Sequence, residues 1–124
     1  MQKSNESAKP YGLELIIDLK GCALENLSQK KLQDFFITLC DRIDMTRHGD
    51  PLFWEDWSNI PHLHGISAIQ FIETSNVVCH CLPLLKAVYL NVFSCKEFDS
   101  EDALKFCKEY WGAETEFHTT ITRN

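Results

Sequence analysis

The chain has 124 residues, of which 44% are hydrophobic, and this length and composition suit one domain with a single core. Its 18 acidic residues outnumber its 12 basic ones, which gives a formal net charge of -6. Lysine and arginine are adjacent only at Lys30-Lys31. This balance argues against contact with a phosphate backbone, so we expect no nucleic-acid partner.

The N-terminal residues are polar and fit neither a secretory signal nor a membrane anchor. No apolar run approaches the roughly 18 residues that span a bilayer. We therefore expect a flexible segment over residues 1–11, one domain over 12–124, no membrane partner and a cytoplasmic location. In that reducing compartment the cysteines should be thiols. They are Cys22, Cys40, Cys79, Cys81, Cys95 and Cys107.

The first half of the chain predicts a strand, a helix and an irregular segment. Residues 12–19 are apolar and rich in β-formers, which predicts a strand. From Ser28 as N-cap, apolar residues recur at three and four positions as far as Ile43, which predicts an amphipathic helix. Residues 46–61 hold prolines and tryptophans without a sustained period, and indicate a long loop or an irregular hairpin arm.

The second half predicts a sheet with one further helix. Strands are expected at residues 65–72, 76–82, 86–95 and 114–122. The first two are joined by Glu73-Thr74-Ser75. Asp99 can cap a helix that ends at Gly112. The whole order predicts an α+β fold: a two-layer α/β sandwich whose mainly antiparallel sheet carries two helices on one face.

The run Cys79-His80-Cys81 invites a metal or redox reading, with His62 and His64 as further ligands. Side chains alternate along a strand, so the two cysteines should face one way and His80 the other. Three adjacent ligands cannot then converge on one ion, and we expect no metal. A redox pair lacks the helix N-terminus that lowers a thiol pKa. Packing in a core is the simpler role for Cys79 and Cys81.

Five short segments keep one order along the chain: Asp18-Leu19-Lys20-Gly21-Cys22, Gly65-Ile66-Ser67, Thr74-Ser75-Asn76, Cys79-His80-Cys81-Leu82-Pro83-Leu84 and Val92-Phe93-Ser94-Cys95. Together, over about residues 12–122, they resemble the bacterial and archaeal type of S-adenosylmethionine decarboxylase. That family has Asp-x-x-Gly-Cys, Gly-x-Ser/Thr, Glu-Ser-His, Ile-His-Thr-Trp-Pro-Glu and Phe-Thr-Cys in these places.

The resemblance implies that the chain cuts itself between Thr74 and Ser75 and converts Ser75 into a covalent pyruvoyl cofactor. His80, five residues on in the paired strand, matches the processing base, and Ser67 matches a hydroxyl that supports processing. Cys95 matches the proton donor. The pyruvoyl ketone would form a Schiff base with the substrate amine and act as electron sink for decarboxylation.

Four positions depart from the family pattern. Thr74 and Asn76 stand where the family has glutamate and histidine. Leu82 and Leu84 replace the tryptophan and the glutamate of Trp-Pro-Glu, and leucine cannot accept the hydrogen bond by which that acid holds a ribose. The ribose contact would then be absent or come from another group, such as Glu73 or a residue of the segment 46–61.

Three functions therefore stay open. The resemblance favours a decarboxylase of S-adenosylmethionine in spermidine biosynthesis, working as a homodimer through the uncovered sheet face. A relative that decarboxylates ornithine or arginine would need an acid for the distal cation. Candidates for that acid are Asp50, Glu55, Asp56 and Glu73. The third reading is an unprocessed, non-catalytic partner of an active paralogue.

Overall fold

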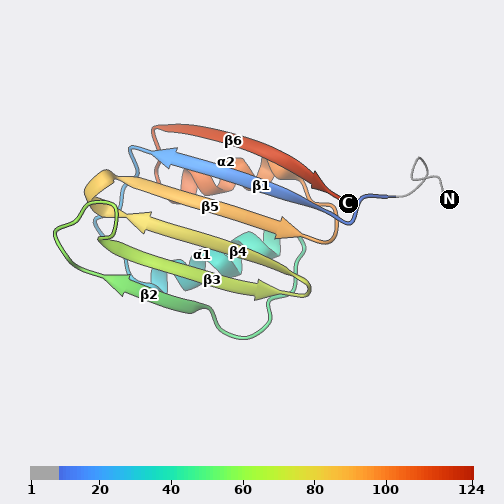
Figure 1. Ribbon diagram of the computed structural model, residues 1–124, viewed down its shortest axis with the longest axis horizontal. Coiled ribbons are helices and arrows are strands. Elements are labelled where there is room, and N and C mark those ends of the chain that lie inside the picture. Colours follow the sequence, from blue (N-terminus) through green and yellow to red (C-terminus); the bar gives the residue numbers. More distant parts are fainter. Residues whose placement is uncertain (1–8) are drawn as a thin grey trace.

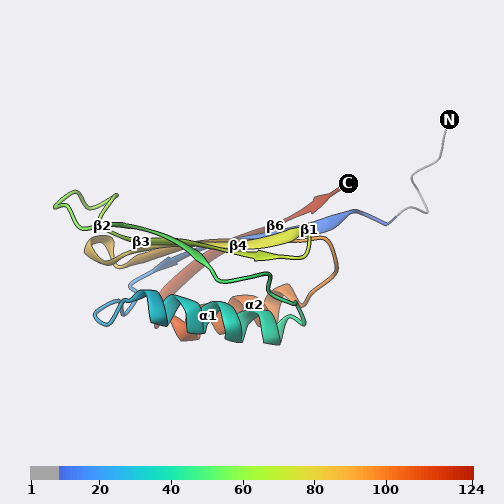
Figure 2. The same ribbon diagram turned by 90° about the horizontal axis from the view of Figure 1, so that it is seen from below.

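The computed structural model describes residues 9–124, which form a six-stranded antiparallel sheet with two helices on one face (Figures 1 and 2). The predicted fold class is therefore confirmed. Most of the expected flexible segment, residues 1–8, lies outside the described part. The elements are β1 (Gly12–Lys20), α1 (Gln29–Arg42), β2 (Leu52–Asp56), β3 (Gly65–Ile72), β4 (Ser75–Leu82), η1 (Pro83–Leu85), β5 (Ala87–Ser94), α2 (Ser100–Tyr110) and β6 (Thr115–Arg123).

The strands lie in the order β2-β3-β4-β5-β1-β6. β3, β4 and β5 form a meander of neighbouring strands, and β1 inserts between β5 and β6 by pairing antiparallel with both. This order leaves β2 at one edge of the sheet and β6 at the other (Figure 1). The β3–β4 turn and the end of β5 lie at the same end of the molecule.

Both helices begin where their capping residues predict. The Ser28 side chain accepts a hydrogen bond from the Lys31 backbone N–H, and the Asp99 side chain accepts one from Asp102. Phe35 on the buried face of α1 stacks on Phe106 of α2, so aromatic rings join the two helices. Both helices cover the same face of the sheet, as Figure 2 shows.

The segment expected as a loop or hairpin arm contains an edge strand. β2 pairs antiparallel with β3, and Trp54 lies opposite Ser67. The loop reading is thus wrong over β2 and the hairpin-arm reading is right. Most side chains of this short strand are exposed, so no alternation of apolar and polar residues marks it. The connection between β3 and β4 is also shorter than expected, since it consists of Glu73 and Thr74 alone.

The two faces of the sheet differ in cover. The face under the helices is closed, and residues such as Leu15, Ile17 and Val77 are fully buried there. The opposite face carries no helix (Figure 2), and we call it the open face. It nonetheless presents large apolar side chains, including Trp54, 73% exposed, and Phe71, 49% exposed. Neither described helix is long and apolar enough to cross a membrane.

Candidate functional site

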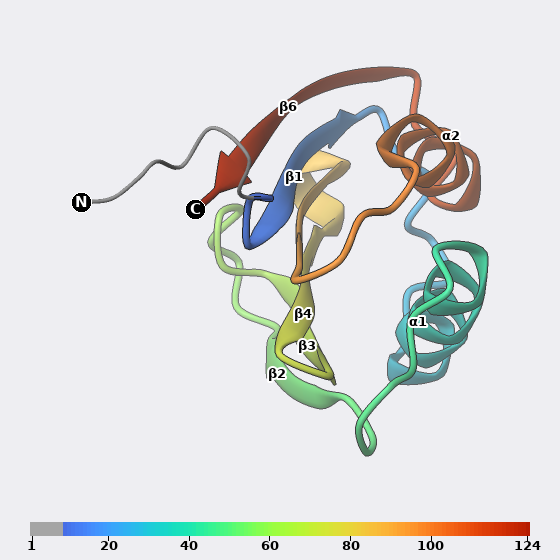
Figure 3. The same cartoon turned by 90° about the vertical axis from the view of Figure 1, so that its right-hand side faces the viewer.

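The start of β4 and the end of β5 lie at the end of the sheet that Figure 3 faces, and Ser75 and Cys95 meet there. Ser75 begins β4, and Cys95 directly follows β5. Because Asn76 pairs with Phe93 in antiparallel register, the start of β4 lies beside the end of β5. The Ser75 Oγ accepts a hydrogen bond from the Cys95 backbone N–H at 2.9 Å, and Ser75 is buried. The structure therefore joins two of the residues singled out from the sequence.

Thr74, the residue before Ser75, has an unusual backbone conformation. Its φ of 48° lies in the left-handed region, which a β-branched residue rarely adopts. Its Oγ1 lies 2.8 Å from the Cys95 Sγ and 2.8 Å from the Glu73 carbonyl oxygen. A residue held in this region stores on the order of 1–3 kcal/mol of strain. That strain lies next to the Thr74–Ser75 peptide bond.

These contacts make the Cys95 thiol more acidic than an ordinary thiol. The Thr74 hydroxyl, and after it the Ser75 hydroxyl, lower the Cys95 pKa by hydrogen bonding to the sulfur. Burial does the opposite elsewhere: it raises the pKa of Cys22 and of Cys40 to about 11. Cys95 therefore differs chemically from the thiols of the core.

Thr74 has one hydroxyl proton for two acceptors, so its donor role depends on the state of Cys95. When the sulfur is a thiolate, that proton can go to Sγ. When the sulfur is protonated, Cys95 can donate to the Glu73 carbonyl oxygen, which lies 3.6 Å from Sγ. The turn can thus accommodate Cys95 with or without its proton.

Ser67 and His80 form a second pair on the open face. They lie opposite each other on β3 and β4, and the His80 Nδ1 is 2.7 Å from the Ser67 Oγ. The sequence singled out both residues, and the cross-strand register explains why they meet. His80 is exposed, so its ring is available to an incoming group.

The two pairs are separate within one chain. We expected His80 on the strand paired with that of Ser75, but both residues lie on β4, and the strand opposite His80 is β3. Five positions along a strand span roughly 16 Å, and an odd number of steps places side chains on opposite faces. Ser75 accordingly faces the helix layer and His80 the open face. One copy of the chain does not bring His80 to Ser75.

Cys79 and Cys81 lie in the core, as the alternation predicted. Both are fully buried, their sulfurs are 3.7 Å apart, and His80 between them is exposed on the other face. All six cysteines are free thiols, which confirms the expectation drawn from the sequence.

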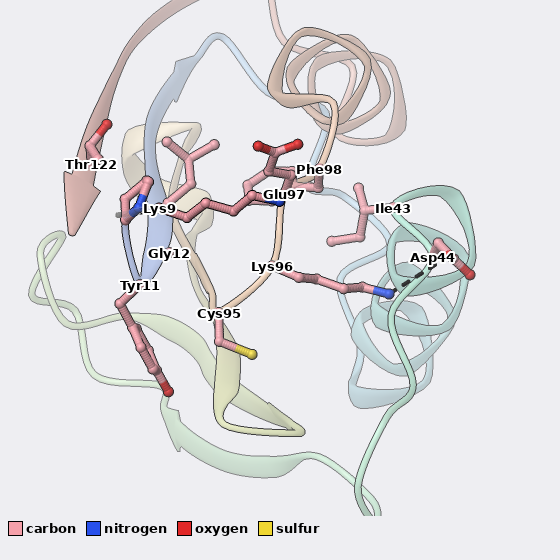
Figure 4. A pocket seen from close by; sticks show the side chains of 12 residues that line it. Lys9, Tyr11, Gly12, Ile43, Asp44, Cys95, Lys96, Glu97, Phe98 and Thr122 are labelled. Atoms are coloured by element: carbon pink, nitrogen blue, oxygen red, sulfur yellow. Dashed lines mark ion pairs between the residues drawn. The ribbon is translucent and has the colours of Figure 1, made fainter. Parts of the chain in front are cut away.

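Cys95 borders two hollows on the helix side. The larger, of about 800 Å³, lies between the start of β1 and the segment after β5 (Figure 4). Lys96 and Asp44 form an ion pair across its wall, with 3.7 Å between Nζ and Oδ2. The smaller, of about 270 Å³, is lined by Thr74 together with Cys95. A small molecule can therefore approach the sulfur from this side.

Gly12 fixes the approach of β1 to the end of β5. A Cβ on Gly12 would lie 2.1 Å from the Ser94 carbonyl oxygen, a distance that real side chains do not adopt. The neighbouring Cys95 is part of the same backbone segment, and its Cα would lie 3.1 Å from that Cβ. The position of the Cys95 thiol thus depends on a residue without a side chain.

The residues expected at a substrate pocket are spread along the sheet. Leu82 ends β4, at the opposite end from Ser75, and Leu84 lies in η1 directly after it and is 52% exposed. Glu73, in the β3–β4 turn, is next to the Ser75 pair. In one chain, then, only Glu73 of these three lies near Ser75.

Two of the other candidate acids, Glu55 and Asp56, already accept hydrogen bonds from side chains and backbone of this protein. Glu55 accepts hydrogen bonds from the Trp57 indole at 2.7 Å and from Gln29. Asp56 accepts from the hydroxyl and the backbone N–H of Ser58, and these bonds lower the pKa of its carboxyl group. Both acids therefore stabilise the arm locally. Asp50 is exposed on the loop before β2.

The sequence reasoning missed the contact between Thr74 and Cys95. Thr74 stood out only as a departure from the family pattern. Counting register back from the tight connection at residues 83–86 would have placed Ser75 opposite the end of β5. No sequence signal marks the left-handed φ of a threonine.

Fold and site together define a two-layer α+β sandwich with a serine–cysteine pair beside a strained hairpin turn. The family model described as S-adenosylmethionine decarboxylase matches residues 13–124. The chain therefore belongs to the S-adenosylmethionine decarboxylase family, which confirms the resemblance seen in its motifs. Membership implies a decarboxylase.

A solved structure supports the same fold. The chain is similar to the crystal structure of the adenosylmethionine decarboxylase from Aquifex aeolicus VF5, with a TM-score of 0.79 over 94% of this chain and 93% of that chain. The two sequences are 13% identical, so this likeness concerns the fold. A search of curated proteins finds no match.

Proposed function

We propose that this chain is a self-processing, pyruvoyl-dependent decarboxylase that generates its cofactor from Ser75. The observation that carries the proposal is the strained backbone of Thr74 directly before Ser75 and beside Cys95. The Cys95 sulfur contacts the Thr74 hydroxyl, and its backbone N–H donates to the Ser75 Oγ. A role of this kind also explains why an acidic thiol lies at the end of a strand while the other cysteines pack in the core.

The residues present fit the proposed self-cleavage. The Ser75 Oγ attacks the Thr74 carbonyl carbon, the C–N bond breaks, and an ester replaces the amide; release of the Thr74 strain favours this step. Removal of the Ser75 Cα proton then expels the Thr74 carboxylate and leaves dehydroalanine. Water converts the dehydroalanine to a ketone with loss of ammonia. The products are residues 1–74 and a chain that begins with the pyruvoyl group.

In the mature enzyme the pyruvoyl ketone would supply the electron sink that side chains lack. Cys95 lies beside this position, and its lowered pKa makes the protonated thiol a better acid. We assign Cys95 the return of a proton to the carbon that loses CO2.

Processing needs a base, and pairing of two chains can supply it. We propose a homodimer in which open faces pack against each other with strands antiparallel. In that arrangement the Ser67–His80 pair of one copy would lie over the Ser75 end of the other. The exposed apolar residues of the open face, such as Trp54 and Phe71, support such packing. His80 of the second copy would then remove the Cα proton.

S-adenosylmethionine is the first candidate substrate, in line with the family, and its product would serve spermidine synthesis. The leucines at positions 82 and 84 favour a second candidate, a basic amino acid such as ornithine or arginine, because they offer no acceptor for a ribose. Glu73, exposed beside Ser75, is then the acid best placed for a distal cation. The free thiols support the cytoplasm as the compartment.

Intact mass of the purified protein tests the proposal. We expect two chains that meet at the Thr74–Ser75 bond, and a single chain of 14.3 kDa from Ser75→Ala. Ser100→Ala, at the half-buried first residue of α2, should cut like the unaltered protein. A single uncut chain from the unaltered sequence would sink both decarboxylase readings and leave the non-catalytic partner. CO2 release from S-adenosylmethionine, ornithine and arginine then separates the substrates.

A further inference from the structure

The two edges of the sheet are built differently. The β2 edge has five residues, follows Pro51, and ends in Glu55 and Asp56. Short length, proline and charge all discourage another strand from pairing with an edge. β6, at the opposite edge, has nine residues and no proline or lysine. In Figure 1 it is the outermost element along its side of the molecule.

The charged side chains of β6 have partners within the chain. The Glu116 carboxylate lies within hydrogen-bond distance of the His118 ring, with 2.9 Å between Oε2 and Nδ1, and Arg123 forms an ion pair with Glu14 of β1 at 2.8 Å. The run between them, residues 119–122, is uncharged, and all of it is exposed. An edge with free backbone groups and no repelling charge favours pairing with another strand.

The sequence of β6 is complementary to itself. If two copies pair antiparallel about Thr119, Phe117 of each lies opposite Ile121 of the other, and these side chains are 67% and 43% exposed. An aromatic residue facing a β-branched one is a favourable cross-strand pair. Glu116 meets Thr122 and Arg123 meets Thr115, so no like charges face each other. This register therefore forms the Phe117–Ile121 pair twice and places no like charges opposite each other.

We propose that β6 pairs edge to edge with β6 of a second copy, so that the two sheets continue into one. This interface is distinct from the open face and does not depend on cleavage at Ser75. If the open faces also pair, the assembly contains four copies of the protein.

Disulfide trapping tests the register. His118 and Thr120 lie opposite Ile17 and Leu15 of β1, whose side chains are buried under the helices, so both point to the helix side and cannot meet when open faces pack. We expect an affinity-tagged His118→Cys chain and an untagged Thr120→Cys chain, mixed and oxidised with copper phenanthroline in air, to form a covalent heterodimer. Thr122→Cys in place of Thr120→Cys is the matched control, and should trap at least tenfold less.

A second measurement does not need new cysteines. A lysine at an edge blocks strand pairing, so Thr120→Lys should halve the mass found by light scattering after gel filtration, while Glu55→Lys on the β2 edge should leave it unchanged. Circular dichroism checks that both variants fold. Trapping no greater than the control, or an unaltered protein whose mass equals that of Thr120→Lys at every concentration, would overturn the proposal.

Discussion

At the scale of single residues, the hydrogen bond from the Thr74 hydroxyl to the Cys95 sulfur is the main cause of the lowered Cys95 pKa. In the uncut Ser75→Ala chain, Thr74→Val should raise the Cys95 pKa toward its ordinary value of 9.0, because the main hydrogen bond that favours the thiolate is lost. The pH dependence of alkylation by iodoacetamide, read by mass spectrometry, measures this pKa. Thr46→Val, which lines the same small hollow, is the control.

The same contact links stability to pH, with a definite sign. The Cys95 pKa is lower in the folded chain than in the unfolded one, so the unfolded chain binds more protons between the two values. The stabilisation is present above the unfolded pKa and is lost as pH falls through the folded pKa. An alkylation midpoint that Thr74→Val leaves unmoved would contradict this assignment.

Residues on strands were more predictable than residues in turns. Alternation placed Cys79 and Cys81 in the core and His80 outside, and the structure confirms this. The same parity, applied to the five steps from Ser75 to His80, would have placed them on opposite faces. The conformation of Thr74 could not be predicted, because a β-branched residue ordinarily avoids a positive φ.

At the scale of elements, the cap of α2 should be measurable. Asp99→Ala removes the acceptor for the Asp102 backbone N–H and should lower the free energy of unfolding by about 1 kcal/mol. Urea denaturation of the uncut Ser75→Ala chain measures this. Lys105→Ala, in the middle of the same helix, should change little. Equal effects of the two substitutions would mean that the cap does not stabilise the helix.

Elements with a strong period were predicted nearly to their ends. The caps at Ser28 and Asp99 and the apolar spacing between them fixed both helices. β2 was not separable from a loop, since its pairing with β3 is decided by backbone hydrogen bonds at an edge and not by its own side chains.

At the scale of the whole molecule, the open face carries the proposed homodimer. Phe71→Ser should raise the dissociation constant of that dimer at least tenfold, because Phe71 is an exposed aromatic side chain on this face. Sedimentation velocity over a range of concentrations gives the constant. Ile37→Ser, on α1 and away from the open face, should leave it unchanged; a dimer equally weakened by both would place the interface elsewhere.

The family was readable from the sequence, whereas the layout of its residues was not. Motif spacing identified Ser67, Ser75, His80 and Cys95, but linear order does not say which of them share a face. The structure resolves them into two pairs, Ser75 with Cys95 and Ser67 with His80, and this separation is the reason for proposing a site built from two copies. Association between identical chains leaves no period in the sequence that could be read beforehand.

Gly12 shows how a residue without reactive groups can be as restricted as those that react. Every other amino acid there would press on the Ser94 carbonyl and displace the backbone that holds Cys95. In a library of all single substitutions selected for cleavage, Gly12 should tolerate as few replacements as Ser75. A geneticist ranking positions by tolerance would then count it among the catalytic residues, although its role is to leave space.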